Sequence, residues 1–483
     1  MGRMLTTRAL QPPVRPLTAP FPSPSRLDAL ADPGIAPEAT SVKPPNPPIR
    51  EDSQQSNPVR KLSFYFGLAF IFAVFGVVPE LAYHFTGTNT YLIYWVAPAA
   101  ILGALITGGI RRTFQYRAAW YWMAFFVWMV VGIPFSYWRG GSTNVLYDYT
   151  RVCMTMLFVV GGLASNWEEI RAVFYTIGMA GIVNLLTARI FAKEENGRLS
   201  MDDASGTIGN SNDLAAHLII VMPFLLFISM DRKRSPFLRF AMLPLIAYGV
   251  SVILGTASRG GLIALGGIFL FTMVSATPRQ RVLATVAALV LAAVSFAILP
   301  GAALSRLGSL FGQEHREAEE SADSRGYLFR TSVQYSFQHP VFGVGLGQFG
   351  NYEGNTSVSA GKLGNWHATH CSWTQISSEC GIPALLLSIW GIGSALVLVH
   401  RTWRQARAQG FTDIANACYC YLVAMVGFLI AITFLANAYR FYLPAMIGLA
   451  ISMSFVARRQ MSARTTSDRH FGGMIRPQPI TVR

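Results

Sequence analysis

Long apolar stretches recur along this chain and constrain its fold more than any other feature. Each is roughly 17–25 residues long, enough to cross the ~30 Å hydrocarbon core of a membrane as a helix. A spanning segment that is not part of a closed barrel must be helical, because lipid offers no hydrogen bonds to the backbone. We therefore predict an all-α integral membrane protein with about twelve transmembrane helices. The predicted spans are 62–83, 91–110, 119–137, 148–164, 170–190, 211–229, 240–256, 260–276, 282–299, 375–399, 415–435 and 441–457.

The charged residues are few and unbalanced. Hydrophobic residues make up 52% of the chain and charged residues only 13%, with a net charge of +15. Soluble domains carry about 25% charged residues. Lys and Arg occur in short clusters between apolar stretches, which is typical of membrane orientation. The lipid bilayer is therefore an expected partner, and nucleic acid is not.

The distribution of basic residues predicts an orientation. With the N-terminus inside the cell, the short inner loops hold thirteen Lys and Arg residues and the outer loops hold seven. Cytoplasmic loops are enriched in these residues. We therefore expect a multi-pass membrane protein with both termini in the cytoplasm.

Four regions are predicted. Residues 1–60 contain 13 of the 26 prolines and no long apolar stretch, which indicates a disordered cytoplasmic tail. A polytopic membrane domain covers 61–458 and includes one large, partly helical extracytoplasmic loop at 300–374. Residues 459–483 form a basic cytoplasmic tail.

Neither a metal ion nor another cofactor is expected. The five cysteines form no CxxC pair and are predicted to be small apolar residues. The adjacent carboxylates Asp202 and Asp203 have no evident third ligand. The segment 345–350 matches GxGxxG but follows no convincing βαβ unit, so we reject a dinucleotide site.

Arginines at the outer edge of the membrane are expected to have a specific role, because placing Arg near hydrocarbon costs about 2.5–3.5 kcal/mol on insertion scales. Arg259 lies in a short, glycine-rich turn, where a guanidinium can hold a phosphate with paired donors. The alternative is that Arg259 only extends its side chain to the membrane–water interface and binds no ligand. Arg198 lies in the outer loop before Ser211 to Asp213, which are predicted to cap the sixth span. Capping alone is the alternative role for those residues.

Two further residues are candidates. His370, at the entry to the tenth span, can accept a proton from an attacking hydroxyl near neutral pH, although a lone histidine is more often structural. Glu379 lies nine residues later and is not expected to contact His370 along one straight helix.

These motifs together resemble the O-antigen ligase and polysaccharide polymerase superfamily, over roughly residues 62–457. The family's Gly-Thr-x-Gly-Asn region corresponds here to 206–215, and its Ser-Arg-Gly turn corresponds to 258–260. Its loop arginine corresponds to Arg325, and its His…Glu-x-Gly stretch corresponds to 370–381. The chain departs from the family pattern at Ser211, at Cys371 and at Thr374.

The resemblance implies a glycosyltransferase of the bacterial inner membrane that needs no metal. Its donor is a glycan on undecaprenyl diphosphate, and its acceptor hydroxyl belongs to lipid A core, another glycan or a protein. Arg198, Arg259 and Arg325 would bind the diphosphate, and His370, together with Arg259, would carry the catalysis. Fixed cations stabilise a diphosphate leaving group well in a poorly hydrated site.

Two other classes remain open at this point. A polysaccharide transporter or flippase predicts charged residues at mid-membrane and an internal repeat of broken helices. A non-catalytic component of a polysaccharide assembly complex predicts no loss of glycan output when Arg259 or His370 is replaced.

Overall fold

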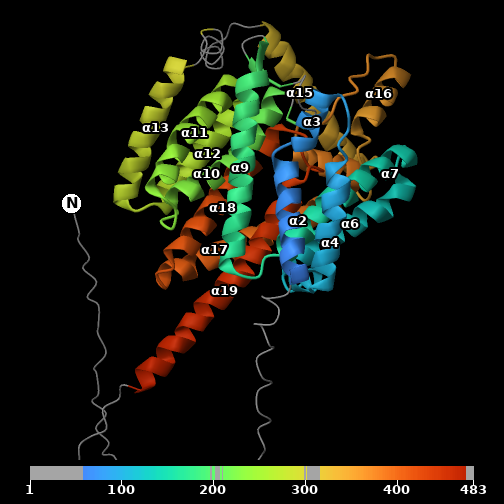
Figure 1. Cartoon of the computed structure of the whole chain (residues 1–483). Helices are drawn as coiled ribbons and strands as arrows, with labels where there is room; N and C mark the ends of the chain where they lie inside the picture. The colour runs from blue at the N-terminus through green and yellow to red at the C-terminus, as the bar shows by residue number, and fades with distance from the viewer. Residues whose placement is uncertain are drawn as a thin grey trace, which may run out of the picture. The chain divides into compact units, whose positions relative to one another are not determined.

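The computed structural model describes residues 58–195, 198–201, 207–208, 210–298, 301 and 316–474 (Figure 1). Almost all of the predicted tail 1–60 therefore lies outside the described residues. The first elements are α2 (Pro58–Phe75), α3 (Val78–Thr86), α4 (Leu92–Ile106), α5 (Gly109–Thr113), α6 (Arg117–Gly132), η1 (Ile133–Phe135), α7 (Arg139–Asp148), η2 (Tyr149–Met154), α8 (Thr155–Gly162), α9 (Trp167–Phe191), β1 (Lys193–Glu195), β2 (Arg198–Ser200) and α10 (Ser211–Met230). They are followed by α11 (Pro236–Gly255), α12 (Arg259–Ser275), α13 (Pro278–Ile298), α15 (Arg316–Gln338), α16 (Phe349–Ser359), α17 (Ser372–Ala408), α18 (Thr412–Ala431), η3 (Ile432–Phe434) and α19 (Tyr442–Met474).

The predicted class, an all-α membrane protein, is confirmed. Among the described residues, eight helical segments are long and apolar enough to cross a membrane, and two apolar helices, α4 and α12, are shorter. Helices lie in all twelve predicted stretches, but the count of twelve spans stays a prediction. One small antiparallel hairpin, β1–β2, was not predicted.

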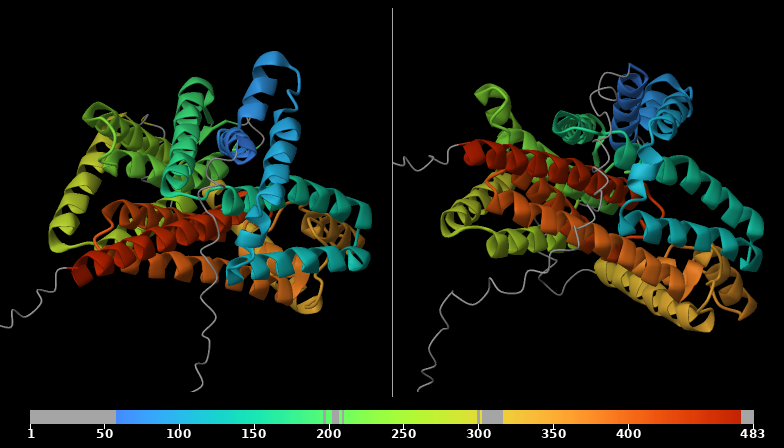
Figure 2. Two further views of the ribbon diagram at one scale, coloured as in Figure 1. Left: turned by 60° about the horizontal axis from the view of Figure 1, so that its bottom comes forward. Right: turned by 90° about the horizontal axis from the view of Figure 1, so that it is seen from below.

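Burial separates inner helices from peripheral ones. In α10, 78% of the apolar window is buried, and in α18 the share is 67%. The window in α13 is only 6% buried although it is apolar, as expected for a helix that faces lipid. Figure 2 shows the red α19 running alongside the orange helices α17 and α18. All five cysteines are buried and free, as small apolar residues would be.

Ion pairs join four helix ends at one end of the bundle. Arg171 near the start of α9 lies 3.1 Å from Asp231 at the end of α10 and 2.8 Å from Asp413 at the start of α18. Arg60 in α2 pairs with Glu169 in α9 at 2.8 Å. The predicted spans cross the membrane in alternating directions, so the starts of α2, α9 and α18 and the end of α10 are expected on the same side. In Figure 1 these ends lie opposite α15 and α16.

Helix α17 bends where it receives the large loop. Gly381 has a φ of 86°, and Pro383 follows within the helix. Proline has no backbone N–H, so the carbonyl of Glu379, four residues earlier, loses its helical partner. The amide of Gly345 in the loop donates to that carbonyl at 2.9 Å.

Further backbone bonds complete this junction. Val344 N donates to Ser378 O at 2.8 Å, and Ile382 N donates to Pro340 O at 2.8 Å. A Cβ atom on Gly381 would lie 1.9 Å from the carbonyl oxygen of Val341. Only glycine fits here, since the backbone is left-handed and the loop is in direct contact.

Aromatic rings hold the opposite side of the loop. The Phe342 ring stacks on Phe135 at 4.3 Å and on Trp128 at 5.2 Å between centroids. Tyr137 N donates to Val344 O at 2.9 Å. Residues 340–346 are therefore fixed between the end of α6 and the bend of α17.

The described residues extend into the predicted C-terminal tail, whose boundary stays a prediction. Helix α19 continues without a break to Met474, so the stretch predicted as a tail from residue 459 begins as helix. Residues 475–483 lie outside the described part of the chain.

Candidate active site

Arg259 is the first residue of α12. Ser258 caps this helix, accepting a hydrogen bond from Gly261 N at 3.2 Å, and Ala257 before it has a φ of 46°. A Cβ atom on Gly260 would lie 3.0 Å from Phe434, so the glycine allows the start of α12 to pack against the α18–α19 connection. The exposed guanidinium of Arg259 stands at the same end of the bundle as the large loop.

Arg198 holds this turn in place. Its Nε donates to Thr256 O at 3.1 Å, and its Nη2 donates to Asn212 Oδ1 at 2.8 Å. One side chain thus links β2 to the α11–α12 turn and to the first turn of α10. Of the predicted cations, Arg198 is the one whose protein acceptors the structure describes.

The predicted cap of α10 is wrong by one position. Asn210, rather than the residues from Ser211 to Asp213, caps the helix, because its Oδ1 accepts from the backbone amides of Asn212 and Asp213 at 3.0 and 2.9 Å. The Asn212 side chain is left free to accept from Arg198, and Asp213 accepts from Asn437 Nδ2 at 3.2 Å.

Arg325, in the loop helix α15, is brought close to Arg259. Burial, and then the nearby positive charge of Arg259, lower the pKa of the Arg325 guanidinium. Within the part of the chain that the structure describes, neither arginine has a carboxylate partner. Two adjacent, unpaired guanidinium groups repel one another, and an anion between them would remove that cost.

His370 completes the cluster just before α17. Its backbone is left-handed, with a φ of 54°, and its side chain is partly buried. Burial lowers the pKa of the imidazole first, and the charges of Arg325 and His367 lower it further. The ring is therefore neutral at pH 7 and able to accept a proton.

Three of the four predicted site residues are thus electrostatic neighbours, and the fourth positions one of them. Residues 243–389 match a family model described as O-antigen ligase. Over this stretch the chain is similar to O-antigen ligases. Arg259, Arg325 and His370 all lie within it, whereas Arg198 precedes it. No match to the chain was found among curated proteins.

Glu379, which also lies in the matched stretch, has a role that the sequence did not reveal. Its buried carboxylate accepts from the backbone amides of Gly347 at 3.0 Å and Phe349 at 3.3 Å. Gly343, Gly345 and Gly347 all have positive φ values. The GxGxxG segment is therefore a tight turn that docks on α17, which explains its glycines without a dinucleotide.

A second buried carboxylate organises the loop and was also missed. Glu353 in α16 is fully buried and accepts from the Tyr327 hydroxyl at 3.0 Å. It also accepts from the backbone amides of Asn365 at 2.9 Å and Trp366 at 3.3 Å. Glu353 thereby ties α15, which carries Arg325, to the segment that leads to His370.

The Gly-Thr-x-Gly-Asn region has an anchor as well. Glu80, at the start of α3, accepts from Thr207 N at 2.9 Å and from the Thr207 hydroxyl. Within 206–215, residues 206 and 209 lie outside the described residues, as do Asp202 and Asp203. Among the residues that are described, no group of three His, Cys, Asp or Glu side chains could hold a metal ion.

Proposed function

We propose that this protein is a glycosyltransferase. It moves a glycan from a polyprenyl diphosphate carrier to an acceptor hydroxyl at the outer face of the inner membrane. The observation that carries the proposal is the juxtaposition of Arg259, Arg325 and His370, with no carboxylate partner for either arginine among the described residues. The O-antigen ligase match over the same residues supports it.

The chemistry follows from the charges. The acceptor oxygen attacks the anomeric carbon of the donor sugar while His370 takes the proton of the hydroxyl. The bond between that carbon and the phosphate oxygen breaks, and the lipid diphosphate leaves with its electron pair. Arg259 and Arg325 bind the diphosphate and stabilise the negative charge that grows on it. Attack from the face opposite the leaving group inverts the anomeric centre.

Arg198 contributes in a different way. Its bonds to Thr256 and Asn212 fix the turn that presents Arg259. It also adds positive charge close to the diphosphate. A substitution at Arg198 is therefore expected to impair both the position of Arg259 and the binding of the donor.

The orientation of the site rests on charge. Inner loops enriched in Lys and Arg lie at the end of the bundle that carries the ion pairs of Arg171 and Arg60. The cluster around Arg259 lies at the other end, so we place it on the extracytoplasmic side and both termini in the cytoplasm.

The first test is the substitution of Arg259 in purified protein supplied with donor and acceptor. Arg259→Ala is expected to lower kcat by about 10²–10³-fold, the cost of losing one stabiliser of transition-state charge. Arg259→Lys is expected to fail almost as badly, because an ammonium cannot reproduce a planar, two-pronged contact. The control is Arg139→Lys at an exposed position. Full transfer by both Arg259 variants would favour a non-catalytic component.

The acceptor is distinguished by a deletion strain. Accumulation of single carrier-linked repeat units indicates a polymerase, and accumulation of long unattached polymer indicates a ligase. Loss of a glycan from proteins alone indicates a protein glycosyltransferase. If none of these appears, the result favours a transporter or an assembly component.

A further inference from the structure

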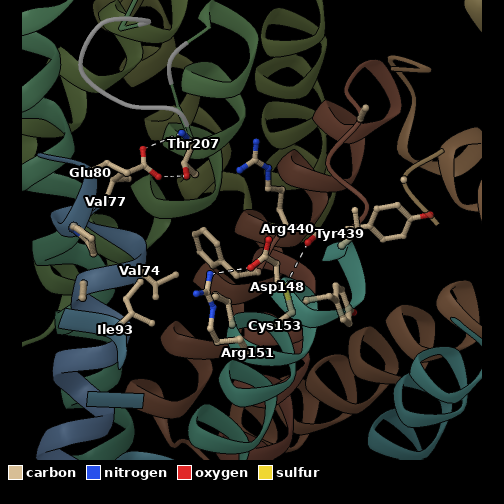
Figure 3. A pocket seen from close by; sticks show the side chains of 18 of the residues that line it. Val74, Val77, Glu80, Ile93, Asp148, Arg151, Cys153, Thr207, Tyr439 and Arg440 are labelled. Carbon is tan, nitrogen blue, oxygen red and sulfur yellow. Dashed lines mark hydrogen bonds and ion pairs between the residues drawn. The ribbon is translucent and has the colours of Figure 1, made fainter. Parts of the chain in front are cut away.

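A pocket of about 530 Å³ lies beside the cation cluster but contains none of its residues. Its floor is apolar and is formed mainly by Ala73 and Val74 of α2, Val77 just before α3 and Ile93 of α4. Its polar side carries Glu80, Asp148, Arg151, Thr207 and Arg440 (Figure 3). Nothing in the proposed transfer mechanism uses these charged groups.

The carboxylates of the pocket already have donors. Glu80 accepts from Thr207, and Asp148 pairs with Arg151 at 2.9 Å. Arg151 is further engaged by the Tyr94 ring, 4.7 Å from its guanidinium carbon. Both acidic groups are therefore satisfied within the protein and do not need the remaining cation.

Arg440 is that remaining cation. It is partly buried in the pocket wall, and the described residues offer it neither a hydrogen-bond acceptor nor an ion-pair partner. Figure 3 shows no dashed line at its guanidinium, whereas dashed lines join Glu80 to Thr207 and Asp148 to Arg151. A partly desolvated guanidinium is stabilised by an anion with paired oxygens, and phosphate fits that geometry.

The shape of the pocket restricts the source of the anion. A free phosphate ion has no use for an apolar floor, but a lipid phosphate is followed by methylene groups that would cover Val74, Val77 and Ile93. We therefore propose that the pocket binds the phosphate headgroup of a membrane lipid, with Arg440 as its anion ligand.

The wall of the pocket contacts the start of α17, which His370 precedes. Ser372, two residues after His370, donates to Leu435 O at 2.6 Å and accepts from Asn437 N at 2.9 Å. Ala436, between these two residues, lines the pocket. Residues 435–440 therefore connect the pocket to the start of α17, which His370 precedes, and in our proposal a lipid held by Arg440 supplies the acceptor hydroxyl on that side. That acceptor role rests on the proposed function, whereas the binding of the lipid does not.

The binding test uses the purified full-length protein in detergent, with dioleoyl phosphatidylglycerol as the probe. Native mass spectrometry gives the apparent Kd of the first bound lipid. Arg440→Gln is expected to raise this Kd at least about tenfold, the usual effect of losing a charged hydrogen bond. Arg139→Gln is the matched control and is expected to change nothing. Val74→Trp, which fills the floor, is expected to weaken binding while Arg440 is retained.

Several outcomes would overturn the assignment. An unchanged Kd in both Arg440→Gln and Val74→Trp would remove the site. If the wild type bound dioleoyl phosphatidylcholine as tightly as dioleoyl phosphatidylglycerol, the site would not be selective for an anionic lipid. Displacement of the lipid by an equal concentration of inorganic phosphate would point to a free-phosphate site instead.

A second measurement separates this inference from the proposed function. At saturating donor, Arg440→Gln is expected to lower the transfer rate while binding of polyprenyl diphosphate stays unchanged; an unchanged transfer rate would contradict the acceptor role. Arg259→Gln is expected to weaken polyprenyl diphosphate binding and to leave phosphatidylglycerol binding unchanged. If the wild type binds phosphatidylglycerol through Arg440 but transfers no glycan, the proposed function fails and the lipid site stands.

Discussion

At the residue scale, the site depends on like charges held close together. Arg259 and Arg325 are neighbours, and the positive charge of Arg325 also acts on His370. Burial lowers the pKa of the imidazole most, and the charge of Arg325, which would also bind the diphosphate in the proposed transfer, lowers it further. A diphosphate site and a proton acceptor support one another in this arrangement, because each needs the cations to be where they are.

The pH dependence of transfer tests this coupling. Burial and the charge of Arg325 lower the pKa of His370, so the base is neutral at pH 7 and is lost only as the pH falls through that lowered value. Arg325→Gln removes one cause, so the pKa is expected to rise and the acidic limb of kcat/KM to move to higher pH. Arg139→Gln is the control for a general charge effect. An acidic limb that does not move in Arg325→Gln would show that Arg325 does not act on His370.

At the scale of elements, the bend of α17 is what attaches the large loop to the membrane domain. The proline and glycine after Glu379 free backbone groups that the loop then uses. The carboxylate of Glu379 holds the next turn of the loop. The loop that carries Arg325 is therefore part of the packed structure rather than an appendage.

Gly381→Ala is expected to weaken this junction. Alanine would be strained at a φ of 86°, and its Cβ would overlap the carbonyl oxygen of Val341. Together these effects should cost about 2–5 kcal/mol of unfolding free energy. Thermal unfolding measures the cost, and limited proteolysis of the loop shows where it falls. Gly393→Ala in the same helix is the control, because nothing lies within 4 Å of the added atom. Equal stability of the two variants would contradict the role of the bend.

Sequence predicted the elements better than their contacts. Apolar length located the helices, and motif order pointed to Arg259, Arg325 and His370. The partners of Glu379 and Glu353 are backbone amides, which carry no sequence signal of their own. The cap at Asn210 was missed because neighbouring Asn, Ser and Asp residues are nearly equivalent as caps. The hairpin β1–β2 is too short for a periodic pattern.

At the scale of the whole molecule, opposite ends of the bundle are built differently. One end is closed by ion pairs around Arg171, which is 3% exposed and faces Asp231 and Asp413. At the other end, Arg259 and Arg325 have no carboxylate partner among the described residues. Paired charges stabilise the structure, and unpaired charges are available to a ligand.

Arg171→Leu tests the stabilising end. It would leave the buried carboxylate of Asp231 without its cation, and breaking a buried pair in this way costs about 3–5 kcal/mol. The thermal midpoint of the purified protein is expected to fall, while the site around Arg259 stays chemically intact. Arg401→Leu, at an exposed position in α17, is the control. A midpoint equal to that of the wild type would show that the ion pairs do not hold this end together.

The side of the membrane on which the cation cluster lies is tested most directly by cysteine labelling. The five native cysteines are buried, so an introduced cysteine can be read against a low background. Leu363 in the large loop is 96% exposed, and Gln409 at the opposite end of α17 is also exposed. In intact spheroplasts, a membrane-impermeant maleimide is expected to label Leu363→Cys, and to label Gln409→Cys only after lysis. Labelling of Gln409→Cys in intact spheroplasts, with Leu363→Cys protected until lysis, would place the cluster inside the cell and contradict the proposed transfer.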